Sequence, residues 1–238
     1  MPLFLSLVVR WLSSGAAAYR NQPDEGFDTA SGLLNRLVLV AGASNDSGRA
    51  VATRLTDAGA RVLAVGSDLR RLAETPAVSR YECDLASPRG VDSLASRIHA
   101  EHGPVDGVVH LVGGWRAGRA DDDWAWLESR VVETFRNTSR AFFEDLKASP
   151  AGRLVMVSST SVEVPTWSNA NYVAAKSAAE AWARSAASGF AKGGAAASVI
   201  LAVASLGPDG TPVEVLADRI VTLWDESAAE LNGVRFTL

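Results

Sequence analysis

The chain has 238 residues, of which 47% are hydrophobic and 21% are charged, and its formal net charge is -4 at pH 7. This length suits one large α/β domain and is short for two. The slight acidic excess excludes a general attraction to nucleic acid, and the single cysteine, Cys83, excludes an intrachain disulfide, a thiolate zinc cluster and a CxxC redox pair. We therefore expect one cytoplasmic domain without a metal site.

The first 32 residues differ in character from the rest. Apolar residues at 4, 5, 8, 9 and 12 have helical spacing, which predicts an amphipathic helix that packs on the domain or on a partner chain. Arg10 interrupts the apolar stretch and no basic residue precedes it, so we expect neither a signal peptide nor a membrane anchor. Residues 1–32 are predicted to be an appendage, and residues 33–238 the domain.

From residue 37 onward, short β-branched runs alternate with longer Ala-rich segments. The predicted strands are "LVLVA", "RVLAV", "SRYEC", "GVVHLV", "RLVMVS" and "ASVILAVA", with a short closing strand in "ELNGVRFTL". Helices are predicted in 48–59, 88–103, 124–148 and 171–191. This order predicts an α/β fold with a single doubly wound parallel sheet of the Rossmann type and helices on both faces, whose ligands bind at the carboxyl ends of the strands.

The turn after the first predicted strand, "GASNDSG", has the place of a phosphate-binding loop before a helix. Gly42 permits the tight turn, and Gly48 lets the helix start close to the sheet. Ser44, Asn45 and Ser47 add hydrogen-bonding groups to the helix N-terminus. Asp46 places a negative charge there, and we expect it to cap the helix, to tolerate a left-handed backbone, and to face away from a bound pyrophosphate or weaken its binding.

The segment "SSTSVEVPTWSNANYVAAK" follows the fifth predicted strand and carries the candidate catalytic residues. Ser159 ends the strand, Tyr172 follows it by thirteen residues, and Lys176 lies one helical turn beyond Tyr172. An adjacent ammonium is expected to lower the pKa of the phenol, so that Tyr172 exchanges a proton with a carbonyl or carbinol oxygen. Ser159 would hold that oxygen, and Lys176 would also reach a cofactor ribose. A partly solvated helix face is the structural alternative for Tyr172 and Lys176.

With Ser159, Tyr172 and Lys176 at this spacing, the sequence resembles the short-chain dehydrogenase/reductase family from about residue 37 to the C-terminus. The resemblance implies a nicotinamide cofactor, a small-molecule substrate and assembly into a homodimer or homotetramer, with no membrane partner. It also implies the remaining cofactor contacts. The complete predicted set is Gly42, Ser44, Asn45, Asp46, Ser47, Gly48, Ser67, Asp84, Leu85, Gly113, Tyr172 and Lys176.

Asp84 in "CDLASP" matches the acidic turn that accepts a hydrogen bond from the adenine amino group, with Leu85 assisting through its backbone. The alternative is a loop aspartate that caps the helix starting near Arg89. Gly113 keeps the glycine that lets the backbone approach the cofactor ribose, but His110 and Leu111 replace the family's asparagine pair. His110 is interpreted as a structural residue rather than a proton carrier.

Two further departures concern the proton relay and the nicotinamide. The family often has an asparagine in the helix before the catalytic strand, and its expected place falls near Arg130 to Val132, whereas Asn137 comes too late. "SLGPDG" replaces the Pro-Gly that contacts the carboxamide, so Leu206 and Gly207 would have to serve by their backbone.

The end of the second strand, "AVGSDLRRL", bears on cofactor choice. An acid at the tip would select NAD, whereas a missing acid with nearby arginine accommodates the 2'-phosphate of NADP. Gly66 has the acidic position and Ser67 follows it, while Arg49, Arg70 and Arg71 supply positive charge beside Asp68. We expect NADP(H) to be favoured over NAD(H). The alternative for the arginines is a solvated helix face.

"GGWRAGRADDDWAW" resembles a stretch of the dihydropteridine reductases, whose cleft accepts a flat bicyclic ring. Trp115 is therefore predicted to stack on an aromatic or quinonoid substrate, or alternatively to pack against the start of the "DDDWAW" helix. The sequence thus predicts an NAD(P)(H)-dependent oxidoreductase that acts on a carbonyl, alcohol or quinonoid compound. The alternative is a catalytically silent nucleotide-binding regulatory or scaffold protein on the same fold.

Overall fold

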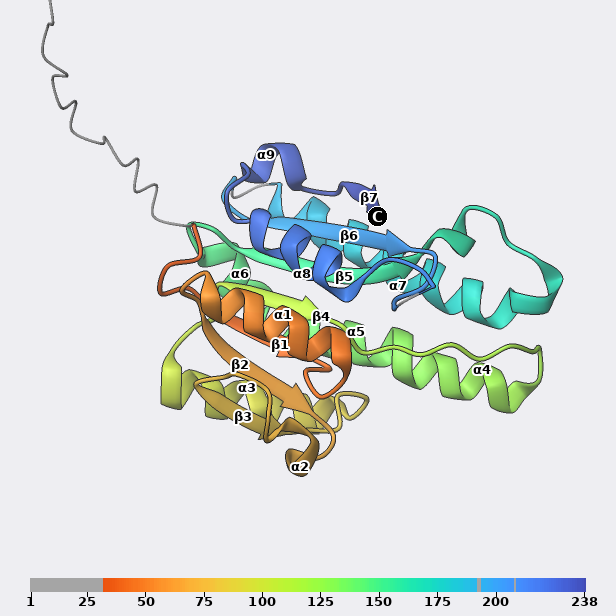
Figure 1. The fold of residues 1–238 in the computed structure, drawn as a ribbon, viewed down its shortest axis with the longest axis horizontal. Helices are drawn as coiled ribbons and strands as arrows, with labels where there is room; N and C mark the ends of the chain where they lie inside the picture. Colours follow the sequence, from red (N-terminus) through yellow and green to blue (C-terminus); the bar gives the residue numbers. More distant parts are fainter. Residues whose placement is uncertain (1–31, 192–193, 208) are drawn as a thin grey trace, which may run out of the picture.

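The computed structural model describes residues 32–191, 194–207 and 209–238 (Figure 1). All seven strands of the sheet in these ranges run parallel, in the order β3-β2-β1-β4-β5-β6-β7. The strands are β1 (Leu37–Ala41), β2 (Arg61–Gly66), β3 (Ser79–Glu82), β4 (Gly107–His110), β5 (Arg153–Ser159), β6 (Ala197–Val203) and β7 (Arg235–Thr237). The predicted doubly wound sheet is confirmed. The predicted amphipathic helix of the appendage lies outside the described residues.

The helices cover both faces of the sheet. The longer ones are α1 (Asp46–Asp57), α3 (Pro88–His102), α7 (Ala170–Phe190) and α8 (Val213–Thr222). The predicted helix over 124–148 consists of α4 (Asp121–Leu127), a π-helical turn η1 (Glu128–Glu133), α5 (Thr134–Ala141) and α6 (Phe143–Ala148). Short helices are α2 (Leu69–Leu72) and α9 (Ala228–Leu231), with 3-10 turns η2 (Thr160–Val162) and η3 (Trp167–Asn169). The sequence interpretation did not include α8.

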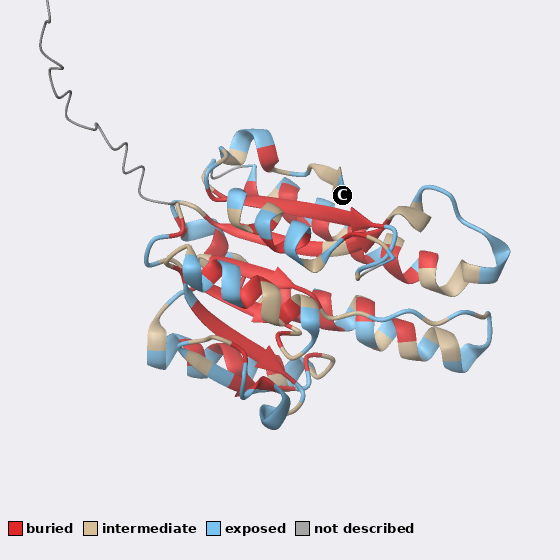
Figure 2. Ribbon diagram, viewed as in Figure 1, coloured by how far each residue is buried: buried red, intermediate tan, exposed pale blue. Residues whose placement is uncertain are grey.

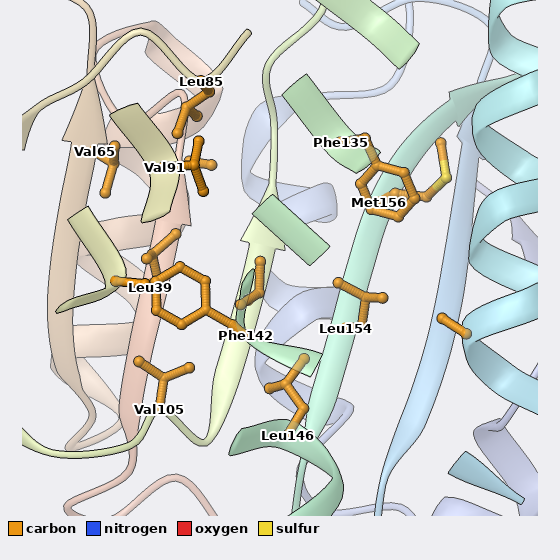
Figure 3. Close-up of a cluster of buried hydrophobic side chains, with 14 of the residues drawn as sticks. Leu39, Val65, Leu85, Val91, Val105, Phe135, Phe142, Leu146, Leu154 and Met156 are labelled. Atoms are coloured by element: carbon orange, nitrogen blue, oxygen red, sulfur yellow. The ribbon is translucent and has the colours of Figure 1, made fainter. Parts of the chain in front are cut away.

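Burial explains why the strands read as continuous apolar runs. Every residue of β1, β4 and β6 is buried, as expected for a parallel sheet covered by helices on both sides (Figure 2). One core layer packs α3, α5 and α7 on the sheet and includes Leu39, Phe135, Phe142 and Leu154 (Figure 3). The second layer packs α1 and α8 on the opposite face. The sheet is therefore packed between two layers of buried apolar side chains, which hold the strand ends in place.

The carboxyl ends of the strands lie at one edge, where α4 and the loop between β5 and α7 project beyond the sheet (Figure 1). These two segments contact each other, because Asn171 Nδ2 donates a hydrogen bond to the Ala120 carbonyl at 3.1 Å and the Gly118 amide donates to the Ser168 carbonyl at 3.3 Å. Parallel α/β sheets bind their ligands at this edge. The fold therefore places all the predicted site segments around one region.

No helix in the described parts of the chain is long and apolar enough to cross a membrane. Within the same parts, no group of three or more histidine, cysteine or acidic side chains is arranged to hold a metal ion.

Candidate active site

The glycine turn between β1 and α1 closes tightly against the sheet. Gly42 has a φ of +84°, and a Cβ at this position would lie 2.9 Å from the Val112 nitrogen. A Cβ on Gly48 would lie 2.3 Å from the Gly42 carbonyl oxygen. Both positions require glycine, Gly42 for its left-handed backbone and Gly48 for its close approach, as predicted.

Asp46 behaves differently from the prediction in two respects. The helix cap is Asn45, whose side-chain oxygen accepts a hydrogen bond from the Gly48 amide at 2.7 Å. Asp46 is the first residue of α1, and Asn35 is the only non-glycine residue with a positive φ in the described ranges, so Asp46 needs no left-handed backbone. Its carboxylate is exposed and pairs with Arg49 Nη2. Asp46 thus points toward Arg49 and does not line the two cavities described next.

Two adjoining cavities lie at the strand ends and share Asn45, Val112 and Gly113. The smaller, of about 230 Å³, lies over the ends of β2 and β3. The larger, of about 590 Å³, lies over the ends of β4, β5 and β6. Most of the predicted site residues line one or both of them, namely Gly42, Ser44, Asn45, Ser47, Ser67, Asp84, Leu85, Gly113, Trp115, Tyr172 and Lys176.

The smaller cavity contains Asp84, for which the sequence left two roles open. Asp84 lines it, and its carboxylate accepts a hydrogen bond from the Ala86 amide at 3.0 Å. The alternative role for Asp84 as the cap of α3 is wrong, because Ser87 caps that helix through a hydrogen bond from the Gly90 amide. Asp84 is therefore free of the helix and exposed at the cavity.

Asn137 has a role that the sequence interpretation missed. It is buried on α5, and its Nδ2 donates hydrogen bonds to the carbonyls of Leu85 at 3.1 Å and Ala86 at 3.0 Å. These bonds fix the loop that carries Asp84. A buried asparagine needs such partners, but the spacing of Asn137 from Leu85, 52 residues along the chain, gives no local signal for them.

The π-helical turn η1 also contributes to this cavity. Ser129, Arg130 and Thr134 line it from the α4–α5 side, opposite the ends of β2 and β3. Single π-turns within α-helices are frequent at functional sites. The guanidinium of Arg130 lies 5.2 Å from the ring centroid of Trp126, which places a cation beside the cavity that the sequence interpretation did not assign.

The three arginines near β2 have different surroundings. Arg70 bonds Asp68 through its side chain, with Nη2 at 3.1 Å from Oδ2, and this pairing raises the pKa of Arg70 and lowers the pKa of Asp68. Arg71 lines the smaller cavity and also a neighbouring one of about 510 Å³ that Arg49 and Arg70 share. Arg71 is the arginine of this cluster that reaches the smaller cavity.

Tyr172 and Lys176 line the larger cavity from the first turns of α7. Lys176 is 6% exposed, and its Nζ donates a hydrogen bond to the Val157 carbonyl of β5 at 2.9 Å. The same nitrogen lies 6.0 Å from the Tyr172 ring centroid. A Cβ on Gly113 would lie 3.6 Å from it, so the loop after β4 closes over the lysine.

Burial dominates the proton affinities of these groups. It lowers the pKa of Lys176 to about 8, while the negative charge of Glu180 acts in the opposite direction. Burial raises the pKa of Tyr172, and the nearby Ser159 hydroxyl acts to lower it. The predicted lowering of the Tyr172 pKa is therefore wrong for this structure, because desolvation outweighs the neighbouring groups and Lys176 bonds to the backbone.

Ser159 ends β5 as predicted and is buried. Its Oγ accepts a hydrogen bond from the Ser161 amide at 3.2 Å, which caps the turn η2. The effect of Ser159 on the Tyr172 pKa places the two hydroxyl groups near each other. The structure thus brings Ser159, Tyr172 and Lys176 together, although Ser159 does not itself line the larger cavity.

His110 lies at the end of β4, buried against Phe135 with their ring centroids 5.2 Å apart. Burial, with the charge of Lys176, lowers the pKa of His110 to about 3, so the ring is neutral at physiological pH. Its Nε2 has no hydrogen-bond partner among the described residues. The ring is therefore neutral and packed but not fully hydrogen-bonded, and its structural role stays a prediction.

Trp115 is 67% exposed and lines the larger cavity. Trp115 was alternatively expected to pack against the "DDDWAW" helix. It is the neighbouring residue, Gly114, that lies against this helix, since a Cβ on Gly114 would come within 2.4 Å of the Trp126 ring. Leu206 also lines this cavity, from the loop after β6. Trp115 thus presents an aromatic face at the cavity entrance.

Residues 36–213 match the model of the short chain dehydrogenase family. The chain is 30% identical to a 3beta-hydroxysteroid dehydrogenase of Mediterraneibacter gnavus, over 82% of this chain and 74% of that protein. It is 28% identical to the 2,3-dihydro-2,3-dihydroxybenzoate dehydrogenase of Bacillus subtilis, over 63% of this chain and 62% of that protein, so the matched part is less than two thirds of that relative. The fold is similar to L-sorbose reductase from Gluconobacter frateurii, complexed with NADPH and L-sorbose, with a TM-score of 0.78, 19% identity, and coverage of 88% and 97% of the two chains.

Proposed function

Because the chain belongs to the short-chain dehydrogenase/reductase family of oxidoreductases, we propose that it transfers a hydride between NADP(H) and a carbonyl, alcohol or quinonoid small molecule, with Ser159, Tyr172 and Lys176 as its catalytic residues. The observation that carries this proposal is the juxtaposition of Tyr172 and Lys176 in one cavity that adjoins the glycine turn. A reacting carbon at that junction would lie within reach of both the phenol and the cofactor.

The residues present fit a nicotinamide dinucleotide. Gly42 and Gly48 let the turn pack tightly against the sheet, and the N-terminus of α1 borders the shared part of the two cavities at Asn45. Asp84 and Leu85 would hold the adenine, and Gly113 with Lys176 the nicotinamide ribose. When bound, the cofactor supplies or accepts the hydride.

Each catalytic side chain has a role that its environment supports. Tyr172 has a raised pKa and is therefore a neutral phenol at physiological pH, which suits donation of a proton to the oxygen of a reduced carbonyl. Ser159 would accept or donate a hydrogen bond at that oxygen and so orient it. Lys176, charged below about pH 8, would stabilise the negative charge left on Tyr172.

The preference for NADP(H) rests on the end of β2. Gly66 stands where an acid would bind the ribose 2'-hydroxyl, and Asp68, two residues further along the chain, caps α2 and bonds Arg70. Arg71 lines the smaller cavity, and its guanidinium has no hydrogen bond or ion pair with a described residue, so it is available to a 2'-phosphate. Arg49 is nearby but shares its charge with Asp46.

The substrate is proposed to carry a flat aromatic or quinonoid ring. Trp115 offers an exposed ring at the larger cavity, and tryptophan pairs well with aromatic groups in offset or edge geometry. Among the described residues that line that cavity, Lys176 is the only cation and the others are apolar or uncharged.

Assembly into a homodimer or homotetramer in the cytoplasm is part of the same proposal. A surface groove of about 420 Å³ on α5, α6 and α7 contains Phe143 and Trp182, and a second copy packed there would cover these rings. The single cysteine is compatible with a reducing compartment.

The test is a fluorescence titration of the protein with NADPH and NADH, followed by oxidation of the bound cofactor in the presence of ketones and quinonoid compounds. We expect both cofactors to bind, NADPH more tightly, and turnover with at least one class. Absence of binding by either cofactor would contradict the proposal, and binding without turnover would favour the scaffold alternative.

A further inference from the structure

Glu180, one helical turn beyond Lys176 on α7, is a fully buried carboxylate. Its Oε1 accepts hydrogen bonds from Ser158 Oγ at 2.7 Å and from Arg235 Nε at 3.1 Å, and its Oε2 accepts one from Arg184 Nη2 at 2.6 Å. An unpaired carboxylate at such a position would be costly, whereas this one is satisfied on both oxygens. The ion pair is therefore built into the structure between α7, β5 and β7.

Arg235, on β7, uses each guanidinium nitrogen for a different partner. Its Nε bonds Glu180, its Nη1 bonds the Glu163 carboxylate, and its Nη2 donates to the main-chain carbonyl of Ser159 at 3.0 Å. The side chain is 14% exposed. Since the guanidinium is planar and its donors have fixed directions, these three contacts hold the C-terminal strand and the end of β5 in one relative position.

The contacts fall on consecutive residues of β5. Lys176 bonds the carbonyl of Val157, Glu180 bonds the hydroxyl of Ser158, and Arg235 bonds the carbonyl of Ser159. Lys176 and Glu180 lie four and eight residues beyond Tyr172, so all three share one face of α7. The strand end that carries the catalytic serine is thus fixed to the helix that carries the catalytic tyrosine.

We propose that Glu180 and Arg235 are positioning residues, whose buried ion pair fixes the end of β5 against α7 and so sets the separation between the Ser159 hydroxyl and the Tyr172 phenol. The effect on catalysis rests on the proposed function. The fixing of Ser159 by Glu180 and Arg235, called the clamp below, does not depend on it. Neither Glu180 nor Arg235 lines the two cavities, so both act through Ser159, Tyr172 and Lys176.

The charge of Glu180 adds a second link to the site. It raises the pKa of Lys176 against the larger effect of burial. Tyr172 on α7 and His110 on β4, which burial keeps neutral, also lie near this lysine. Arg235 and Arg184 pair with Glu180 and so offset part of its charge. Loss of the carboxylate is therefore expected to lower the pKa of Lys176 further.

The experiment compares Arg235→Met with Arg184→Met. Both arginines pair with Glu180, but Arg184 is half exposed and reaches only Glu180, whereas Arg235 also holds Ser159. We measure kcat, the KM for NADPH, and amide hydrogen exchange in the peptide that covers residues 153–163. For Arg235→Met we expect kcat to fall on the order of 10- to 100-fold, an unchanged KM for NADPH, and faster exchange in this peptide. Arg184→Met removes the partner of Glu180 Oε2 but leaves the contacts of Arg235 with Glu180 and Ser159 in place, so we expect a clearly smaller fall in kcat and little change in the exchange of this peptide.

Two further variants keep the proposal falsifiable if Arg235→Met folds poorly. Arg235→Lys retains the charge but cannot reach three partners from one nitrogen, so its kcat should remain reduced. Glu180→Gln should move the alkaline limb of the kcat profile to lower pH, which a simple loss of stability would not do.

The inference would be overturned if Arg235→Met had the kcat and the amide exchange of the wild type. It would also be overturned if Arg184→Met lost as much kcat as Arg235→Met. If the wild-type protein turns over no carbonyl or quinonoid compound, the proposed function fails, whereas the clamp is still decided by the exchange of residues 153–163. Unchanged exchange there would overturn the clamp independently of activity.

Discussion

Lys176 Nζ donates a hydrogen bond to the main-chain carbonyl of Val157 at 2.9 Å, which joins α7 to the strand that ends in Ser159. The lysine is therefore oriented by the backbone rather than by the phenol of Tyr172. Its Nζ lies 6.0 Å from the centroid of the Tyr172 ring. This geometry determines how the site should respond to pH and to substitution.

The pKa of Lys176, about 8, predicts an alkaline limb in the rate of carbonyl reduction. As pH rises through about 8, Lys176 loses its charge, whereas Tyr172, whose pKa is raised above its ordinary value of 10, keeps its proton. In Lys176→Arg the cation stays charged, so the limb should move to higher pH even if the maximal rate falls. A profile of kcat/KM from pH 6 to 10 checks this. An unshifted limb in Lys176→Arg would assign it to another group.

Arg71 is expected to select NADPH over NADH. Removing its guanidinium in Arg71→Ala should weaken NADPH binding on the order of 10-fold or more, because a hydrogen bond to a charged group contributes about 1.5–3 kcal/mol. NADH binding should be nearly unchanged. Arg70→Ala is the matched control, because Arg70 is already engaged by Asp68. Paired fluorescence titrations measure both. If Arg71→Ala lost affinity for NADPH and NADH equally, Arg71 would not bind the 2'-phosphate.

Replacement of Asp46 should improve cofactor binding. Asp46→Gly restores the glycine of the usual turn and removes a charge at the helix N-terminus, and Asp46→Asn removes the charge while keeping a polar side chain. Both variants free Arg49 from its ion pair, so NADPH should bind more tightly than in the wild type. The same titrations provide the measurement. Unchanged or weaker binding in both variants would show that Asp46 has a structural role.

Trp115 is expected to contribute to substrate affinity. Trp115→Ala should raise the KM for aromatic ketones or quinonoid compounds several-fold, because about 0.5–1.5 kcal/mol of ring stacking is lost, and should leave the KM for NADPH unchanged. Trp167→Ala is a matched control, since Trp167 is equally exposed but packs under Arg119 and does not line the larger cavity. Equal effects of the two substitutions would argue against a stacking role for Trp115.

Much of the fold follows from local pattern. The buried strands and the requirement for glycine at positions 42 and 48 were predictable, because burial on both faces of a parallel sheet and a tight turn each leave a short-range signature. The spacing of Ser159, Tyr172 and Lys176 gave the candidate site for the same reason. What the sequence did not provide were contacts between distant segments.

Two residues with distant contacts, and one pKa, illustrate what the sequence could not predict. Asn137 holds the carbonyls of Leu85 and Ala86, and Arg235 holds the carbonyl of Ser159, across 52 and 76 residues respectively. The pKa of Tyr172 also depends on how deeply tertiary packing buries the phenol, and that desolvation reversed the expected direction. Such contacts and such burial depend on the folded arrangement of distant segments, so no local sequence motif predicts them.

Tyr172 is proposed to transfer the proton in a hydride-transfer reaction. The most direct test follows the oxidation of NADPH at 340 nm in the presence of a panel of ketones and quinonoid compounds, with wild-type protein and Tyr172→Phe, while fluorescence titration confirms that both bind NADPH equally. We expect turnover by the wild type and a loss of at least about 100-fold in kcat for Tyr172→Phe. Turnover that persists undiminished in Tyr172→Phe would contradict it.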